Sequence, residues 1–111
     1  MGKFMLLYKG PATEPADMQP EAAQAVMAKW AEWMQGVGSA LADMGAPMNK
    51  TGVSVVDDGS TGTTEQLNGY SILEASDLKA ATALCAGHPF LSDSDGKFSI
   101  EVYELLPVPG M

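Results

Sequence analysis

One side chain of this sequence could act as an acid or a base near neutral pH without a perturbed pKa, and it belongs to the single histidine, His88. A histidine base normally needs a carboxylate that orients its ring, and Glu74, Asp93, Glu101 and Glu104 are available for this. We therefore predict His88 as the candidate catalytic residue. The alternative is a structural histidine, placed where the dipole of a preceding helix favours it.

Three residues with hydroxyl groups, Tyr8, Ser71 and Tyr103, fall within or at the ends of expected strands, where each could orient a polar atom of a ligand. Trp33 could form a flat wall of a ligand cleft, and packing at a dimer boundary explains it equally well. These four residues are the ligand-binding candidates. Trp30 is expected in the core, and we do not expect the two tryptophans to point into the same core.

The cysteine and histidine content argues against a metal centre. A single cysteine, Cys85, can form neither a disulfide within the chain nor a thiolate zinc site, and a single histidine excludes a multi-histidine site. Cys85 lies on an apolar stripe and is expected to be inert. The segment Asp93–Gly96 resembles part of a calcium loop, but Leu91 and Val102 would then occupy ligand positions. We predict no metal and no cofactor.

Charge and hydropathy exclude further classes. The 111 residues carry 14 acidic side chains against 6 lysines and no arginine, a formal charge of −8. Nucleic acids and anionic membrane surfaces need clustered cations, so neither is expected as a partner. No apolar run approaches the ~18 residues of a membrane span, and we find no export signal. We expect one domain over residues 1–111, located in the cytoplasm.

Two segments are predicted to be helices. Apolar residues recur at three- and four-residue steps in a segment that begins at a proline, which predicts an amphipathic helix over Pro20–Asp43. A shorter helix is predicted over Asp77–Ala86, with Ser76 as its N-cap and Gly87 as a left-handed C-cap.

Four strands are predicted, at Phe4–Tyr8, Thr51–Val56, Asn68–Ala75 and Phe98–Leu105. The proline-containing segment Lys9–Gln19 is predicted to be a loop long enough to act as a lid, and Ser92–Gly96 is predicted to be a turn. With right-handed crossovers, this order of elements gives a ferredoxin-like α+β fold, in which two helices lie on one face of a four-stranded antiparallel sheet.

The uncovered face of such a sheet should be polar in a monomer. Here Phe4, Leu6 and Tyr8 point one way, whereas Met5 and Leu7 point the other, so both faces of the first strand are apolar. An exposed apolar sheet would aggregate or pair. We predict a homodimer whose sheets pack face to face into a barrel.

Five segments, in their order and spacing, resemble the YCII-related (DGPF-type) domain family, a branch of the dimeric α/β-barrel proteins: Lys3–Tyr8, Trp30–Trp33, Asn68–Ala75, His88–Phe90 and Ile100–Leu105. The resemblance covers most of the chain. It implies a dimer with a cleft between the helices and the sheet.

Some branches of that family carry a histidine on the first helix and an aspartate just before a proline after the second helix, proposed as an acid–base pair. Here the helical position falls near Met34, with Trp33 as its neighbour, and His88 stands before Pro89 in place of the aspartate. The resemblance therefore implies the location of a pocket and not the chemistry of this pair.

These observations predict a protein that binds a small organic molecule in an apolar cleft. If it is catalytic, we expect proton transfer of the lyase or isomerase kind without a cofactor, with His88 as the base. The alternative is a module without catalytic activity that senses a ligand or binds a protein.

Overall fold

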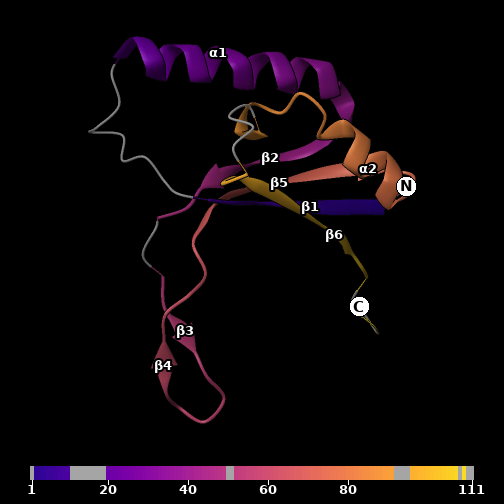
Figure 1. Ribbon diagram of the computed structural model, residues 1–111. Coiled ribbons are helices and arrows are strands. Elements are labelled where there is room, and N and C mark those ends of the chain that lie inside the picture. Colours follow the sequence, from indigo (N-terminus) through magenta and orange to yellow (C-terminus); the bar gives the residue numbers. More distant parts are fainter. Residues whose placement is uncertain (1, 11–19, 50–51, 92–95, 108, 110–111) are drawn as a thin grey trace.

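Two helices lie on one face of a four-stranded sheet, as Figure 1 shows. The computed structural model describes residues 2–10, 20–49, 52–91, 96–107 and 109. The predicted lid over Lys9–Gln19 and the predicted turn over Ser92–Gly96 lie mostly outside these residues. The helices are α1 (Pro20–Val37) and α2 (Leu78–Leu84), and the strands of the sheet are β1 (Gly2–Lys9), β2 (Leu41–Pro47), β5 (Leu67–Ala75) and β6 (Ser99–Leu105).

The strands of the sheet run antiparallel in the order β2-β5-β1-β6. Leu6 at the centre of β1 stands opposite Ser71 on β5 and Val102 on β6. This order, with a helix between β1 and β2 and another between β5 and β6, is the ferredoxin-like α+β arrangement. The predicted fold class is confirmed.

Side chains on the central strands alternate between the two faces of the sheet. Phe4, Leu6 and Tyr8 are buried on the face that the helices cover, whereas Met5 and Leu7 are half-buried on the opposite face. We call this opposite face the outer face; its side chains are Lys3, Met5, Leu7, Tyr70, Ile72, Glu74, Glu101, Tyr103 and Leu105. The predicted apolar character of both faces is therefore present in the folded chain.

The first helix is shorter than predicted. α1 ends at Val37, and a 3-10 turn over Gly38–Ala40 leads directly into β2. Gly38 has a φ of +61°, a left-handed conformation in which an α-helix ends. Leu41 has helical spacing in the sequence, but it packs against the core from a strand. The predicted helix over Pro20–Asp43 is therefore wrong beyond Val37.

The predicted strand over Thr51–Val56 does not join the main sheet, because β2 takes that place. Two short strands, β3 (Ser54–Val55) and β4 (Thr61–Gly62), pair only with each other. They form a hairpin that projects from the sheet on the side away from the helices (Figure 1). We call residues 52–66 the arm.

The second helix begins one residue later than predicted. The carboxylate of Asp77 accepts a hydrogen bond from the Ala80 amide at 2.8 Å, so Asp77, and not Ser76, is the N-cap. Gly87 follows the helix with a φ of +76°, as predicted for a left-handed residue there. In the described part of the chain, neither helix has the length and apolar character needed to cross a bilayer.

Candidate functional site

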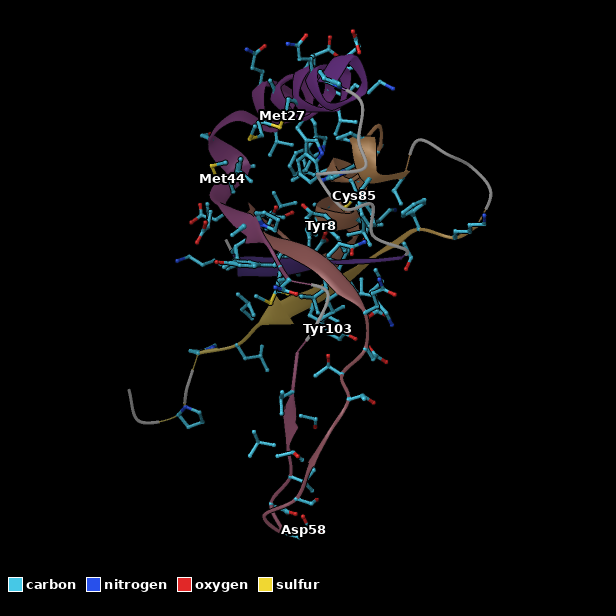
Figure 2. The ribbon with its side chains drawn as sticks, turned by 90° about the vertical axis from the view of Figure 1, so that its left-hand side faces the viewer. Tyr8, Met27, Met44, Asp58, Cys85 and Tyr103 are labelled. Atoms are coloured by element: carbon cyan, nitrogen blue, oxygen red, sulfur yellow. The ribbon has the colours of Figure 1, made fainter. Side chains whose placement is uncertain are left out.

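A pocket of about 380 Å³ lies between α1 and the β2–β5 side of the sheet. Its wall is aromatic and rich in methionine, and none of the described residues that line it is charged. Met27 on α1 and Met44 on β2 are 67% and 64% exposed, and Figure 2 shows Met27 above Met44 on the same side of the molecule. The other principal lining residues are Tyr8, Trp30, Trp33, Met34, Pro47, Ser71 and Phe90.

Gly45 allows β2 to lie against β5 at the floor of this pocket. Its φ is +74°, and a Cβ atom there would fall on the carbonyl oxygen of Tyr70. The pairing of β2 with β5 shifts register twice between Leu41 and Ala46, so the strand bulges at this point. The bulge brings the Met44 carbonyl oxygen within 2.9 Å of Ser71 Oγ.

A chain of hydrogen bonds leads from His88 to this strand. The Phe90 amide donates to His88 Nδ1 at 3.0 Å, so Nδ1 carries the lone pair and Nε2 carries the proton. Nε2–H then donates to the Tyr8 hydroxyl at 3.1 Å. Ser71 Oγ donates to Met44 O, and the Tyr8 hydroxyl must therefore donate to Ser71 Oγ, which lies 2.6 Å away. Each group in this series of hydrogen bonds, from the Phe90 amide to the Met44 carbonyl oxygen, therefore has a donor and an acceptor role that its neighbours match.

Aromatic rings surround the imidazole of His88. Its centroid lies 4.2 Å from that of Trp33, 4.6 Å from that of Trp30 and 5.0 Å from that of Tyr8. The side chain is buried, and the loss of hydration lowers the pKa of His88 from 6.5 to about 4. His88 is therefore neutral at physiological pH. The indole of Trp33 is held in place by a hydrogen bond from Nε1 to the Leu84 carbonyl oxygen at 3.0 Å.

The two tryptophans share one cluster, which corrects the expectation that they would not. Positions three apart on an α-helix differ by only about 60° around its axis. Trp30 and Trp33 therefore both face the sheet, with ring centroids 6.3 Å apart, and both contact His88. The predicted role of Trp33 as a wall fits its position, since it lines the pocket while it is buried.

No described carboxylate lies within hydrogen-bonding distance of His88. Glu74 and Glu101 point to the outer face, where Glu101 lies 3.5 Å from Lys9 Nζ. Glu104 is exposed, and Asp93 lies outside the described residues. The Phe90 amide, and not an acidic side chain, orients the imidazole.

The nitrogens of His88 do not reach the pocket. A second hollow, of about 670 Å³, lies between α1 and the segment after α2, and His88 contributes to its wall together with the charged residues Lys29 and Glu32. The His88 side chain is nevertheless only 1% exposed, and both ring nitrogens are hydrogen-bonded within the protein. Tyr8 and Ser71, whose hydroxyl groups follow His88 in the hydrogen-bond chain, are among the residues that line the 380 Å³ pocket.

Tyr8 and Cys85 both stay protonated at neutral pH. Burial raises the pKa of Tyr8 to about 12, although its hydrogen bond with Ser71 acts in the opposite direction. Burial also raises the pKa of the Cys85 thiol, and its Sγ lies 3.7 Å from the Ala81 carbonyl oxygen. The Cys85 thiol therefore has the unreactive environment that the sequence predicted.

The structure brings together four of the five predicted site residues: Tyr8, Trp33, Ser71 and His88. Tyr103 lies apart from them, because β6 turns it to the outer face, where it is 53% exposed (Figure 2). Sequence reasoning missed the wall that Met44 and Pro47 provide. The signal that could have found this wall is Gly45 with Pro47 two residues later, a pattern that fits a bulged strand at the edge of a sheet.

The fold and this pocket define a ferredoxin-like α+β protein with an apolar pocket between its first helix and its sheet. The chain belongs to the YCII-related domain family, whose model matches residues 1–108. No curated protein sequence matches it. Among the described residues, no group of three or more His, Cys, Asp and Glu side chains could hold a metal ion.

One solved structure with a similar fold is 5-chloro-2-hydroxyhydroquinone dehydrochlorinase from Burkholderia phenoliruptrix AC1100, in complex with 2,5-dihydroxybenzoquinone. The TM-score is 0.51 and the sequence identity is 17%, over 94% of this chain and 93% of that chain. At this level of identity the similarity supports the fold.

Proposed function

We propose that this protein binds a small, uncharged aromatic molecule in the pocket between α1 and the sheet. The observation that carries the proposal is the wall of the pocket, which encloses about 380 Å³ and in which the described residues are mainly aromatic or methionine, with no charged side chain among them. A cavity of about 150 Å³ holds benzene, so this pocket has room for a molecule of one or two rings. A charged ligand would lose its hydration there with no partner of opposite sign.

The hydrogen-bond chain narrows the class of ligand further. The Tyr8 hydroxyl and Ser71 Oγ each use their proton within the protein, and each keeps a lone pair. Asn68, also among the lining residues, has a buried Oδ1 with no hydrogen-bond partner among the described residues. The pocket therefore offers acceptors rather than donors, and the preferred ligand carries a hydroxyl or amino group that donates.

The similar solved structure supports the size of the proposed ligand, since the molecule bound there has a single ring. That protein is in complex with 2,5-dihydroxybenzoquinone, a name that describes one ring with two hydroxyl groups. Its name also describes a dehydrochlorinase, which makes catalysis the second candidate function for this chain.

Binding fits the observed state of His88 better than catalysis does. A base must offer a free lone pair, and the lone pair of His88 is occupied by the Phe90 amide. A pKa of about 4 also makes the imidazole a weak base. For proton transfer of the lyase or isomerase kind, the His88–Phe90 loop would have to open and release Nδ1. If that happens, a His88→Gln variant should abolish protein-dependent hydrogen–deuterium exchange at carbon in an enolisable ketone.

We also propose that the protein is a homodimer, with the outer face of each sheet packed against the other. Met5, Leu7 and Ile72 give the centre of this face an apolar surface, and no described helix covers it. Tyr103 and Leu105 extend this apolar surface toward the β6 edge, where they are 53% and 39% exposed.

Three single-ring probes test the binding proposal: phenol, anisole and benzoate. Calorimetry should show that phenol binds most tightly, that anisole binds about tenfold more weakly because it lacks the donor, and that benzoate does not bind. Tyr8→Phe removes one of the three acceptors and should reduce the advantage of phenol over anisole, whereas Tyr103→Phe on the outer face should leave it unchanged. Benzoate binding as tight as phenol binding would refute the proposal.

A further inference from the structure

The arm stands away from the body of the protein. Figure 1 and Figure 2 both show it projecting from the sheet on the side opposite the helices, with Asp58 at its tip. Every residue from 52 to 66 is exposed except the half-buried Ser54. At the tip, the Asp58 carboxylate accepts hydrogen bonds from the amide and the hydroxyl of Ser60, at 2.9 Å and 2.6 Å. At its base, Glu65 lies 3.3 Å from Lys9 Nζ.

A hairpin of this kind is not expected to be stable on its own. Each of its strands has two residues, whereas an isolated two-stranded ribbon is marginal in water even when it is longer. The arm nevertheless presents aliphatic side chains to solvent: Val53 is 66% exposed, Val55 82% and Val56 40%. Exposed β-branched residues on a projecting ribbon are typical of a segment that packs against another molecule.

The arm and the outer face lie on the same side of the molecule. One copy of this chain placed against the outer face would therefore lie beside the arm. In a two-fold dimer, the arm of each chain would then contact the other chain. The outer face and the arm would both be covered by the same interface.

The area of the outer face supports a role for the arm. Four strands spaced about 4.8 Å apart, and about seven residues long at about 3.3 Å per residue, make a face on the order of 450 Å². A stable interface needs about 800 Å² from each partner. The flat area of the sheet does not count the relief of its side chains, and the exposed surface of the arm would add to the area that the sheet provides.

We propose that the arm clasps a second copy of this chain across the outer face and that its valines contribute directly to the stability of the dimer. The inference rests on the homodimer proposed above. The partner is this chain rather than a cationic protein, because the centre of the outer face and the valines of the arm are apolar. With a formal charge of −8, two copies repel one another, so apolar contact has to carry the association.

Sedimentation equilibrium of matched variants tests this proposal. Val53→Thr with Val55→Thr removes apolar groups from the arm and keeps its strand propensity, whereas Leu78→Thr makes the same kind of change on α2, at a residue 52% exposed on the helical side. The arm variant should raise the dimer dissociation constant about a hundredfold, because symmetry counts each lost contact twice. Leu78→Thr should leave the dissociation constant unchanged.

Three further measurements separate the contribution of the arm from that of the sheet and from a partner that is held by charge. Leu7→Asp, in the outer face, should abolish the dimer. Amide hydrogen exchange between residues 53 and 62 should accelerate when the wild-type protein is diluted below its dissociation constant. Added salt should tighten the dimer, since it screens the repulsion between two acidic copies.

The outcomes are distinct. A dimer with an unchanged dissociation constant in the arm variant overturns the clasp and leaves the sheet interface in place. A wild-type protein that is monomeric at all concentrations overturns the clasp and the homodimer together. A dimer that weakens as salt rises also overturns the proposal, because charge would then hold it together.

Discussion

The state of His88 makes a quantitative prediction about stability against pH. In the folded chain the pKa of His88 is about 4, because burial disfavours the imidazolium, and in the unfolded chain it returns to about 6.5. Between these values the unfolded state binds a proton that the folded state does not. The free energy of unfolding therefore falls as pH falls through this window, and the contribution of His88 is almost fully retained above about pH 7.

The magnitude follows from the width of the window. Each pH unit is worth about 1.4 kcal/mol, so His88 should remove about 2 kcal/mol of stability between pH 6.5 and pH 5, and about 3 kcal/mol down to pH 4. The pI of the chain is near 4.3, where solubility is lowest, so the measurement should stop near pH 5. A loss of 2 kcal/mol is large beside the roughly 5–15 kcal/mol of total stability that a folded domain has.

Urea unfolding of the wild type and of His88→Gln at pH 7, 6, 5.5 and 5 isolates this contribution. The carboxylates titrate in both proteins, so their effect cancels in the difference between the two unfolding free energies. Between pH 7 and pH 5 the wild type should lose about 2 kcal/mol of unfolding free energy relative to His88→Gln, because only the wild type has a histidine that gains a proton on unfolding. A difference that stays constant with pH would mean that His88 titrates normally in the folded protein, and the description of a buried neutral imidazole would then be wrong.

Two further predictions concern the backbone around the site. Gly45→Ala should destabilise the protein by several kcal/mol, because the new Cβ would fall on the Tyr70 carbonyl in a left-handed residue; a melting temperature within about 2 °C of wild type would contradict the bulge described for β2. Asp77→Ala should cost about 1 kcal/mol of unfolding free energy, whereas Ser76→Ala should cost almost nothing; equal effects would contradict the assignment of Asp77 as the N-cap.

The parts of the fold that were predicted correctly are strands whose side chains alternate between two faces over a few residues. β1 and β5 were predicted within two residues at each end, because buried and half-buried residues alternate strictly along them. Burial of Phe4, Leu6 and Tyr8 on one face followed directly from that pattern. The ferredoxin-like topology then followed from the order of the elements.

The error at β2 has a physical cause that local patterns do not contain. Leu41 and Met44 stand at helical spacing after Val37, but Gly38 takes a left-handed conformation and Gly45 allows a close approach to β5. The pairing of β2 with β5 is a tertiary contact that overrides the apparent helical period. The wall of the pocket that β2 forms was missed for the same reason.

The chemistry of the site also depended on contacts that are distant in the sequence. His88, Tyr8 and Ser71 were predicted as site candidates, and in the structure these residues, up to 80 positions apart, meet in one hydrogen-bond chain. The sequence could not show that the Phe90 amide occupies the imidazole lone pair. With its lone pair occupied by that backbone contact, His88 acts in the folded chain as a fixed hydrogen-bond donor to Tyr8.

The packing of His88 between two indoles gives this protein an internal spectroscopic reporter. The chain contains one histidine, so its carbon-bound ring protons give signals that need no assignment by mutagenesis. The centroids of Trp33 and Trp30 lie 4.2 Å and 4.6 Å from that of the imidazole, so ring currents should displace those resonances far from their positions in a free histidine. Any small molecule that shifts either indole would move those resonances, and unknown ligands could be screened against the unlabelled protein by proton NMR.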